Sequence, residues 1–159
     1  MQYFKILAIA MLFVGFANVS TAQVTANHNV TIVVPTFNLI SVSGDVTITL
    51  GVPASPGSDP ADGTAAGTYS ITTNVAGQKI TAAISADYSA GITLSAALTS
   101  IGGGTAAAST ALSTTAVDLL TGLAAVSDTG TINYTASATA AAAPNGAGET
   151  RAVTYTLTS

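Results

Sequence analysis

The residues that could carry out chemistry are few in this sequence, and they stand apart from one another. There is one histidine, His28, and there are no cysteines. Nucleophilic hydrolysis by a serine needs a base beside it, but no serine lies in a Gly-x-Ser-x-Gly turn, and His28 lies in an alternating run of asparagine and valine. The absence of thiols excludes cysteine nucleophiles and cysteine zinc sites. We therefore predict no catalytic residue, and we expect that the protein is not an enzyme.

The carboxylates give one further candidate for chemistry. Asp59 and Asp62 come close together in the run Ser58-Asp59-Pro60-Ala61-Asp62-Gly63, whereas the other acids stand singly. Calcium needs six to eight oxygen ligands, and this run lacks the alternating acids and the bidentate glutamate of a calcium loop. An ordinary turn in which aspartate bonds to the backbone is favoured, with calcium as the alternative. No cofactor-binding or metal-ligating residue is predicted.

Two other motifs have simpler interpretations. Gly102-Gly103-Gly104 lacks the lysine and the serine or threonine of a phosphate-binding loop, so a flexible connection is expected. Asn29-Val30-Thr31 and Asn133-Tyr134-Thr135 match the N-glycosylation pattern. Both lie inside expected strands, which does not favour modification.

The charge balance limits the classes of partner. Beyond the first 22 residues, only Lys79 and Arg151 are cationic, against the seven acids of the chain. Two isolated cations cannot displace counterions along a phosphate backbone. Nucleic acid and anionic lipid are therefore excluded as expected partners.

The N-terminus has the pattern of a secretory signal. Lys5 precedes an apolar stretch from Ile6 to Ala17, and the small residues Ser20-Thr21-Ala22 follow. The stretch is shorter than the roughly 20 residues that span a bilayer, so cleavage before Gln23 is favoured over a retained anchor. We predict a signal peptide over residues 1–22, one domain over residues 23–159, and an exported protein with no stable membrane span after cleavage.

Alternation of apolar and polar residues is the main structural signal, and it predicts short strands bounded by Gly, Pro, Asn or Asp. The stretch of residues 51–67, with three prolines and four glycines, is expected to be a surface loop. A hairpin turn is expected near Gly77. Segments around Leu112 and from Val117 to Val126 are ambiguous between strand and helical turn. The expected strands cover residues 24–34, a run from Phe37, 46–50, 69–71, 80–86, 92–98, 131–138 and 153–157.

These runs predict an all-β domain of about eight strands. That count is typical of antiparallel β-sandwiches of immunoglobulin-like or jelly-roll type. The alanine-rich residues 136–143 have helical propensity, but the threonines that alternate before them favour a strand followed by a loop. Without cysteines, the domain must be held together by packing and hydrogen bonds alone.

The two ends of the exported chain carry a family resemblance. The runs Asn27-His28-Asn29-Val30-Thr31-Ile32-Val33-Val34-Pro35 and Arg151-Ala152-Val153-Thr154-Tyr155-Thr156-Leu157-Thr158-Ser159 resemble the first and last strands of small bacterial exported Ig-like subunits. The pilins of chaperone–usher fibres and spore-coat-U-type proteins are of this kind. The resemblance implies a fibre or coat subunit, with other subunits and a periplasmic chaperone as partners.

The sequence therefore predicts a secreted, cell-surface or periplasmic structural or adhesive subunit. Residues 24–34 are expected either to form an edge strand of their own domain or to be donated to a neighbouring copy by strand addition. The alternative is a monomeric binding module for glycan or calcium, built on the loops 51–67 and 99–116.

Overall fold

The computed structural model describes residues 24–159 of the chain. The described residues belong to two units, one ending at Val33 and one running from Val34 to Ser159. The predicted signal peptide, residues 1–22, and its cleavage before Gln23 lie outside the described residues. The unit from Val34 onward contains every strand assigned among residues 24–159, and it confirms the predicted all-β class.

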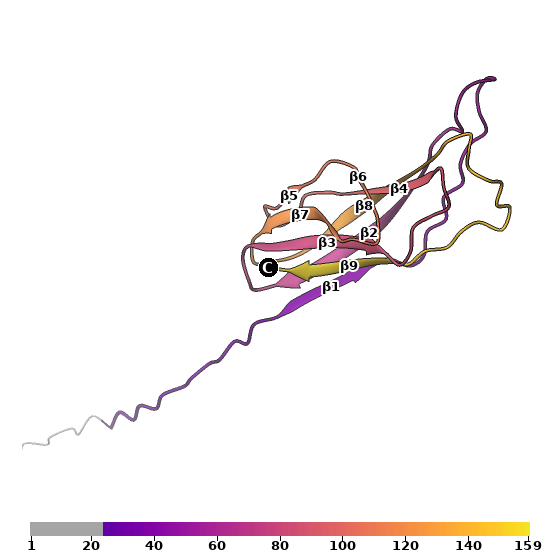
Figure 1. Ribbon diagram of the computed structural model, residues 1–159. Helices are drawn as coiled ribbons and strands as arrows, with labels where there is room; N and C mark the ends of the chain where they lie inside the picture. Colours follow the sequence, from indigo (N-terminus) through magenta and orange to yellow (C-terminus); the bar gives the residue numbers. More distant parts are fainter. Residues whose placement is uncertain (1–23) are drawn as a thin grey trace, which may run out of the picture. The chain divides into compact units, whose positions relative to one another are not determined.

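Nine strands and no helix are found between residues 24 and 159, close to the predicted count (Figure 1). The strands predicted near residues 92–98 and 153–157 are found with almost those bounds. The strands are β1 (Asn38–Val42), β2 (Gly63–Thr73), β3 (Gln78–Ile84), β4 (Ile92–Leu98), β5 (Thr105–Ala106), β6 (Thr110–Ala111), β7 (Val117–Leu123), β8 (Val126–Ala138) and β9 (Val153–Thr158).

The strands form two antiparallel sheets that share one core, as in a β-sandwich. One sheet has the order β1-β2-β8-β4-β6, and the other has the order β5-β7-β3-β9. The longest pairing joins β2 to β8, in continuous register from Gly63↔Ala136 to Thr73↔Val126. The edges of the two sheets are therefore β1, β6, β5 and β9, and two of these strands have only two residues each.

The core comes from the inward side chains of both sheets, at the alternate positions that strand geometry dictates. On β8, for example, Ile132 and Tyr134 are buried while Asn133 between them is exposed. The buried apolar set is Tyr69, Ile71, Ile80, Ala82, Ile84, Leu94, Ala96, Leu98, Ile101, Leu112, Leu119, Leu120, Leu123, Ile132 and Tyr134.

The ambiguous segment after Leu112 is β7, and it departs from strict alternation. Leu119 and Leu120 are adjacent in sequence and both fully buried. The register of β7 with β3 shifts on both sides of Ile80, and a bulge of this kind lets two neighbouring side chains face the same side. The alternation of apolar and polar residues is weak in this segment because the bulge places two consecutive leucines on the same face.

The hairpin expected at Gly77 was wrong in its pairing. The turn is present, and Gly77 has the positive φ of 80° that favours glycine. However, β2 pairs with β1 and β8, whereas β3 pairs with β7 and β9. The turn therefore connects the two sheets, because β2 lies in the five-stranded sheet and β3 lies in the four-stranded sheet.

Residues 43–50, which we name the crossing segment, differ from the prediction of a strand at 46–50. No strand is assigned there, although Ile48 and Leu50 are half-buried. The segment leaves β1 and passes over the core-facing side of β2, where a Cβ on Gly63 would lie 2.5 Å from the Thr49 carbonyl oxygen. A Cβ on Gly67 would lie 2.8 Å from Ser43 Oγ.

These two glycines also explain why the loop predicted over residues 51–67 was too long. β2 already begins at Gly63 and contains Gly67. Glycine inside a strand commonly marks a close approach of another backbone, which is what the crossing segment makes. The loop is therefore limited to residues 51–62.

Residues 24–34 were predicted as a strand, and in the single chain this is wrong. No strand is assigned from Val24 to Phe37, and the apolar side chains are open to solvent, with Val24 93% and Ile32 83% exposed. A strand requires a neighbour to hydrogen-bond with, and none pairs with these residues.

Candidate functional site

The free edge of β9 is the first feature of the candidate site. On its other side β9 pairs with β3 from Lys79↔Thr158 to Ile84↔Val153. The pairing continues with a hydrogen bond from the Ser85 N–H to the Ala152 carbonyl oxygen, at 2.9 Å. Antiparallel ladders alternate between bonded and non-bonded pairs. The backbone N–H and C=O groups that point away from β3 therefore belong to Val153, Tyr155 and Leu157.

These three residues leave backbone groups unused. Among residues 24–159, no hydrogen bond joins the N–H or C=O of Val153, Tyr155 or Leu157 to another group. Their side chains are half-buried against the core, while Thr154 and Thr156 between them are exposed. The edge therefore has unpaired backbone groups beside apolar side chains, and β1 of the other sheet lies close to β9 (Figure 1).

A cavity lies next to this edge. Its volume is about 670 Å³, within the range of small-molecule pockets. Its apolar lining comes from the inner face of the five-stranded sheet, and its sides come from the crossing segment and from residues 145–151. The apolar lining residues on β4 and β8 are Ile92, Leu94, Tyr134 and Ala136, and Val153 contributes from β9.

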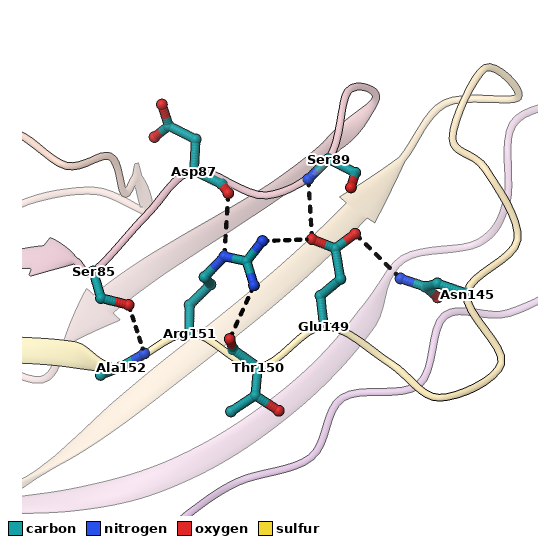
Figure 2. A network of polar contacts seen from close by, with 8 residues as sticks. All are labelled: Ser85, Asp87, Ser89, Asn145, Glu149, Thr150, Arg151 and Ala152. Carbon is teal, nitrogen blue, oxygen red and sulfur yellow. Dashed lines mark hydrogen bonds and ion pairs between the residues drawn. The ribbon is translucent and has the colours of Figure 1, made fainter.

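An ion-pair network, which we name the Arg151 clamp, holds the 145–151 side of the cavity in place (Figure 2). Arg151 bonds to the Glu149 carboxylate at 2.8 Å and donates from Nε to the Asp87 carbonyl oxygen at 3.1 Å. Glu149 also accepts from the Ser89 N–H at 3.2 Å and from Asn145 Nδ2 at 3.4 Å. The clamp thus ties residues 145–151 to the segment between β3 and β4.

The clamp is partly shielded from water, and its two charges, on Arg151 and Glu149, are paired with each other. The side chains of Arg151 and Glu149 are 25% and 16% exposed. The hydrogen bond from Ser89, the contact with Asn145 and the charge of Arg151 hold the pKa of Glu149 below its ordinary value, against the opposing effect of desolvation. The carboxylate therefore stays charged well into the acidic range.

Tyrosines make up the aromatic part of the site. The Arg151 guanidinium lies 5.3 Å from the centre of the Tyr88 ring, in the geometry of a cation–π contact. Tyr155 donates its hydroxyl to the Tyr134 hydroxyl at 2.8 Å. Burial raises the pKa of all three phenols; the charge of Arg151 opposes this at Tyr88, and the hydrogen bond with Tyr134 adds to it at Tyr155.

The sequence-derived candidates do not gather at this cavity. His28 is exposed and lies in the unit that ends at Val33. Asp59 accepts a hydrogen bond from the Ala140 N–H at 2.8 Å, which joins two distant segments and is not the local turn bond that was predicted, and Asp62 is exposed. Within the described part of the chain, no group of three His, Asp or Glu residues is placed to hold a metal ion.

The other motifs are accounted for by local structure. Gly102 and Gly103 have φ values of 56° and 73°, and the Gly104 N–H bonds to the Ile101 carbonyl at 2.9 Å, so the glycine run is a tight turn. Asn29 is exposed in the unpaired segment, and Asn133 is exposed on β8. The predicted loop 99–116 contains the short strands β5 and β6.

Sequence reasoning missed the residues that form the site. Glu149, Arg151 and Tyr88 were not singled out, because their meeting depends on how β3, β4 and β9 come together. One signal was available: Arg151 is one of only two cations outside the first 22 residues, and it precedes the last strand. The loop 51–62 lines only a smaller hollow, of about 330 Å³, through Pro53 and Pro60.

No protein-family model matches this sequence, and no curated protein does. In the part of the chain from residue 24 to residue 159, no helix has the length and apolar character needed to cross a membrane. The function must therefore be argued from the site itself.

Proposed function

We propose that this protein is an exported, non-catalytic structural or adhesive subunit that associates with further copies by β-strand addition. The observation that carries the proposal is the exposure of residues 24–34. Apolar and polar side chains largely alternate from Val24 to Ile32, as in a strand, yet Val30, Ile32 and Val34 are 70% to 83% exposed. Val33, on the opposite face, is 81% exposed. Such a segment is suited to pairing with another chain.

The physical drive for this pairing is the removal of apolar surface from water. Burial of a valine or isoleucine side chain stabilises a complex by about 1.5–3 kcal/mol before the cost of ordering the segment. Main-chain hydrogen bonds then add affinity with little dependence on sequence. Pro35 ends the segment and removes one backbone donor, so the pairing unit is confined to the residues before it.

The remaining features fit a subunit that lies against neighbours outside the cytoplasm. The signal-like residues 1–22 support export, and the low fraction of charged residues, 6%, supports extensive contact with other protein surfaces. Two sheets of five and four strands are compatible with an immunoglobulin-like sandwich. The resemblance of the two chain ends to pilin and coat subunits adds a periplasmic chaperone as a proposed transient partner.

A second candidate function is favoured by the cavity. A hollow of about 670 Å³ with Tyr88, Tyr134, Asn145 and the Arg151 clamp around it combines aromatic surface with polar groups, as glycan sites do. In this alternative the protein is a monomeric exported binding module. Its site would be this cavity, rather than the loops 51–67 and 99–116.

The test compares the chain from Gln23 with a variant that lacks residues 24–34. By sedimentation velocity at increasing concentration, the full chain should form oligomers, and the deletion should remain a folded monomer. As a control, Thr25→Ser and Thr31→Ser together should leave association unchanged, because they alter only the polar face. A full chain that stays monomeric at high concentration would favour the binding module and remove the basis of the proposal.

A further inference from the structure

We infer that the cavity and the smaller hollow beside it bind an uncharged amphiphile, which is a molecule with one alkyl chain and a hydroxyl-bearing head. Alkyl glycosides and monoacylglycerols share this chemistry. The inference rests on the second candidate function, since it names the ligand of the same cavity, and it is independent of strand addition. It also gives the Arg151 clamp a role in selecting the ligand.

The inner part of the cavity is aliphatic. Leu94 on β4 is buried, whereas most of the other aliphatic residues around the cavity are only half-buried and present apolar surface to it. These half-buried residues are Ile48, Leu50, Ile92, Ala136 and Val153. An alkyl chain in the cavity would remove their surface from water, which is favourable in proportion to the area that is covered.

The smaller hollow continues the cavity. The two spaces have volumes of about 330 and 670 Å³, and their linings share Leu50, Ile92 and Asn145. The smaller hollow is itself mainly apolar, because prolines and alanines of the loop 51–62 and of residues 138–143 line it. Two apolar spaces that are joined at shared residues suit an extended alkyl chain better than a compact ring.

Neutral polar groups lie on the open side of the cavity. Thr47 and Thr49 of the crossing segment line it and are exposed, and so is Asn145 on the opposite wall. A few polar groups around an apolar pocket are typical of ligand sites, where they fix the orientation of the ligand. Hydroxyl and amide groups both donate and accept hydrogen bonds, so they suit a head that carries hydroxyl groups.

The charges of the site favour a ligand without a charge. Among the described residues, Glu149 and Arg151 are the only charged residues that line either space, and they are paired with each other at 2.8 Å. A carboxylate or ammonium head would therefore lose its hydration without gaining an unpaired counterion, which is costly. An uncharged head avoids this cost.

The walls of the two spaces are held by contacts between distant segments. The Arg151 clamp ties residues 145–151 to Asp87 and Ser89. The Asp59 carboxylate accepts from the Ala140 N–H at 2.8 Å, and this bond ties the loop 51–62 to the residues that follow β8. A binding site that is already formed loses less entropy when its ligand arrives.

The decisive test is isothermal titration calorimetry of the chain from Gln23 with octyl glucoside, below the concentration at which it forms micelles. Hexyl glucoside should bind about tenfold more weakly, because each buried methylene group contributes a factor of roughly four. Glucose should give no measurable binding. Octanoate should bind about tenfold more weakly than octyl glucoside or less tightly still. Monooctanoylglycerol, titrated in parallel, distinguishes a glyceride head from a sugar head.

Matched variants place the ligand in the cavity. Leu50 lines both spaces, so Leu50→Asp should weaken the binding of octyl glucoside about tenfold or more. Val52 is 83% exposed and lines neither space, so Val52→Asp should change the affinity less than about twofold. If Leu50→Asp does not fold, Val46→Asp takes its place, because Val46 lines the cavity and is already 40% exposed. Equal effects of the lining and the control variant would overturn the inference.

The role of the clamp is tested by a change of selectivity. Arg151→Met leaves the Glu149 carboxylate without its cationic partner, so the variant should bind octylammonium about tenfold more tightly than the parent chain does, and octyl glucoside more weakly. Lys79→Met breaks the Lys79–Asp118 pair, which lines neither space, and it should leave both affinities unchanged. If Arg151→Met weakens octylammonium binding as well, the clamp is only structural and its role in selecting the ligand is wrong.

The outcomes separate this inference from the function on which it rests. If glucose binds as tightly as octyl glucoside, the cavity is a glycan site, the second candidate function stands and the inference is wrong. If octanoate binds as tightly as octyl glucoside, the preference for an uncharged head is wrong. If no probe binds, the inference and the second candidate function are both wrong. Strand addition is decided separately, by sedimentation of the variant that lacks residues 24–34.

Discussion

Residues 24–34 and β9 have nearly the same pattern of alternating apolar and threonine or asparagine residues, but only β9 is a strand. β9 pairs with β3 over six residues, whereas residues 24–34 are exposed and unpaired. The pattern therefore predicts that a segment is able to form a strand. Whether it does so depends on a neighbouring strand with which its backbone can form hydrogen bonds.

The largest expected effect comes from proline substitution on the two sides of this comparison. Thr156→Pro removes an N–H that faces β3, so we expect the free energy of unfolding to fall by about 3 kcal/mol. Thr31→Pro should leave the stability of the monomer unchanged and prevent association. Urea unfolding followed by CD measures the first effect, and sedimentation measures the second. A similar loss of monomer stability in both variants would mean that residues 24–34 pair within their own chain.

A smaller effect is expected from shortening one apolar side chain in each region. Leu157 is half-buried, so Leu157→Ala should lower the free energy of unfolding by about 1–2 kcal/mol, less than for a fully buried leucine. Ile32→Ala should not change it, because Ile32 is 83% exposed. The urea midpoints of the monomers report the difference. If Ile32→Ala also destabilised the monomer, the two regions would be equivalent after all.

The smallest expected effect is on stability at low pH. It concerns β9 alone, because the Arg151–Glu149 ion pair lies directly before this strand. The pKa of Glu149 is lower in the folded chain than in the unfolded one, so its contribution to stability is present above the unfolded pKa and is lost as the pH falls through the folded value. Thermal midpoints between pH 7 and pH 3 should therefore fall more steeply for the parent chain than for Glu149→Gln. Parallel curves would show that the clamp contributes nothing to stability.

The sequence was sufficient for the fold class and for strands that alternate strictly, such as β4 and β9. It was insufficient where a residue's role depends on a distant segment. Gly63 and Gly67 were counted as loop residues, although they belong to β2 and make room for the crossing segment. Leu119 and Leu120 face the same side because of a bulge that involves β3.

The candidate site was harder to predict, for a related reason. Chemistry was sought in residue types that react, such as His28 and Asp59. The site instead depends on backbone groups that every residue carries. Whether those groups are unpaired follows from the order of the strands in the sheet, which residue types do not reveal. Arg151 and Glu149 lie two residues apart in the sequence, but their partners Asp87 and Ser89 come from about sixty residues earlier.

The tyrosines also make the domain its own optical probe. The chain has no tryptophan, so the near-ultraviolet emission of residues 24–159 comes from the phenols of Tyr69, Tyr88, Tyr134 and Tyr155. Burial raises the pKa of Tyr69 to about 12, so its absorption band should shift only in strong alkali or when the core opens. Tyr88 and Tyr134 line the cavity, and their emission would register whatever enters it without any attached label.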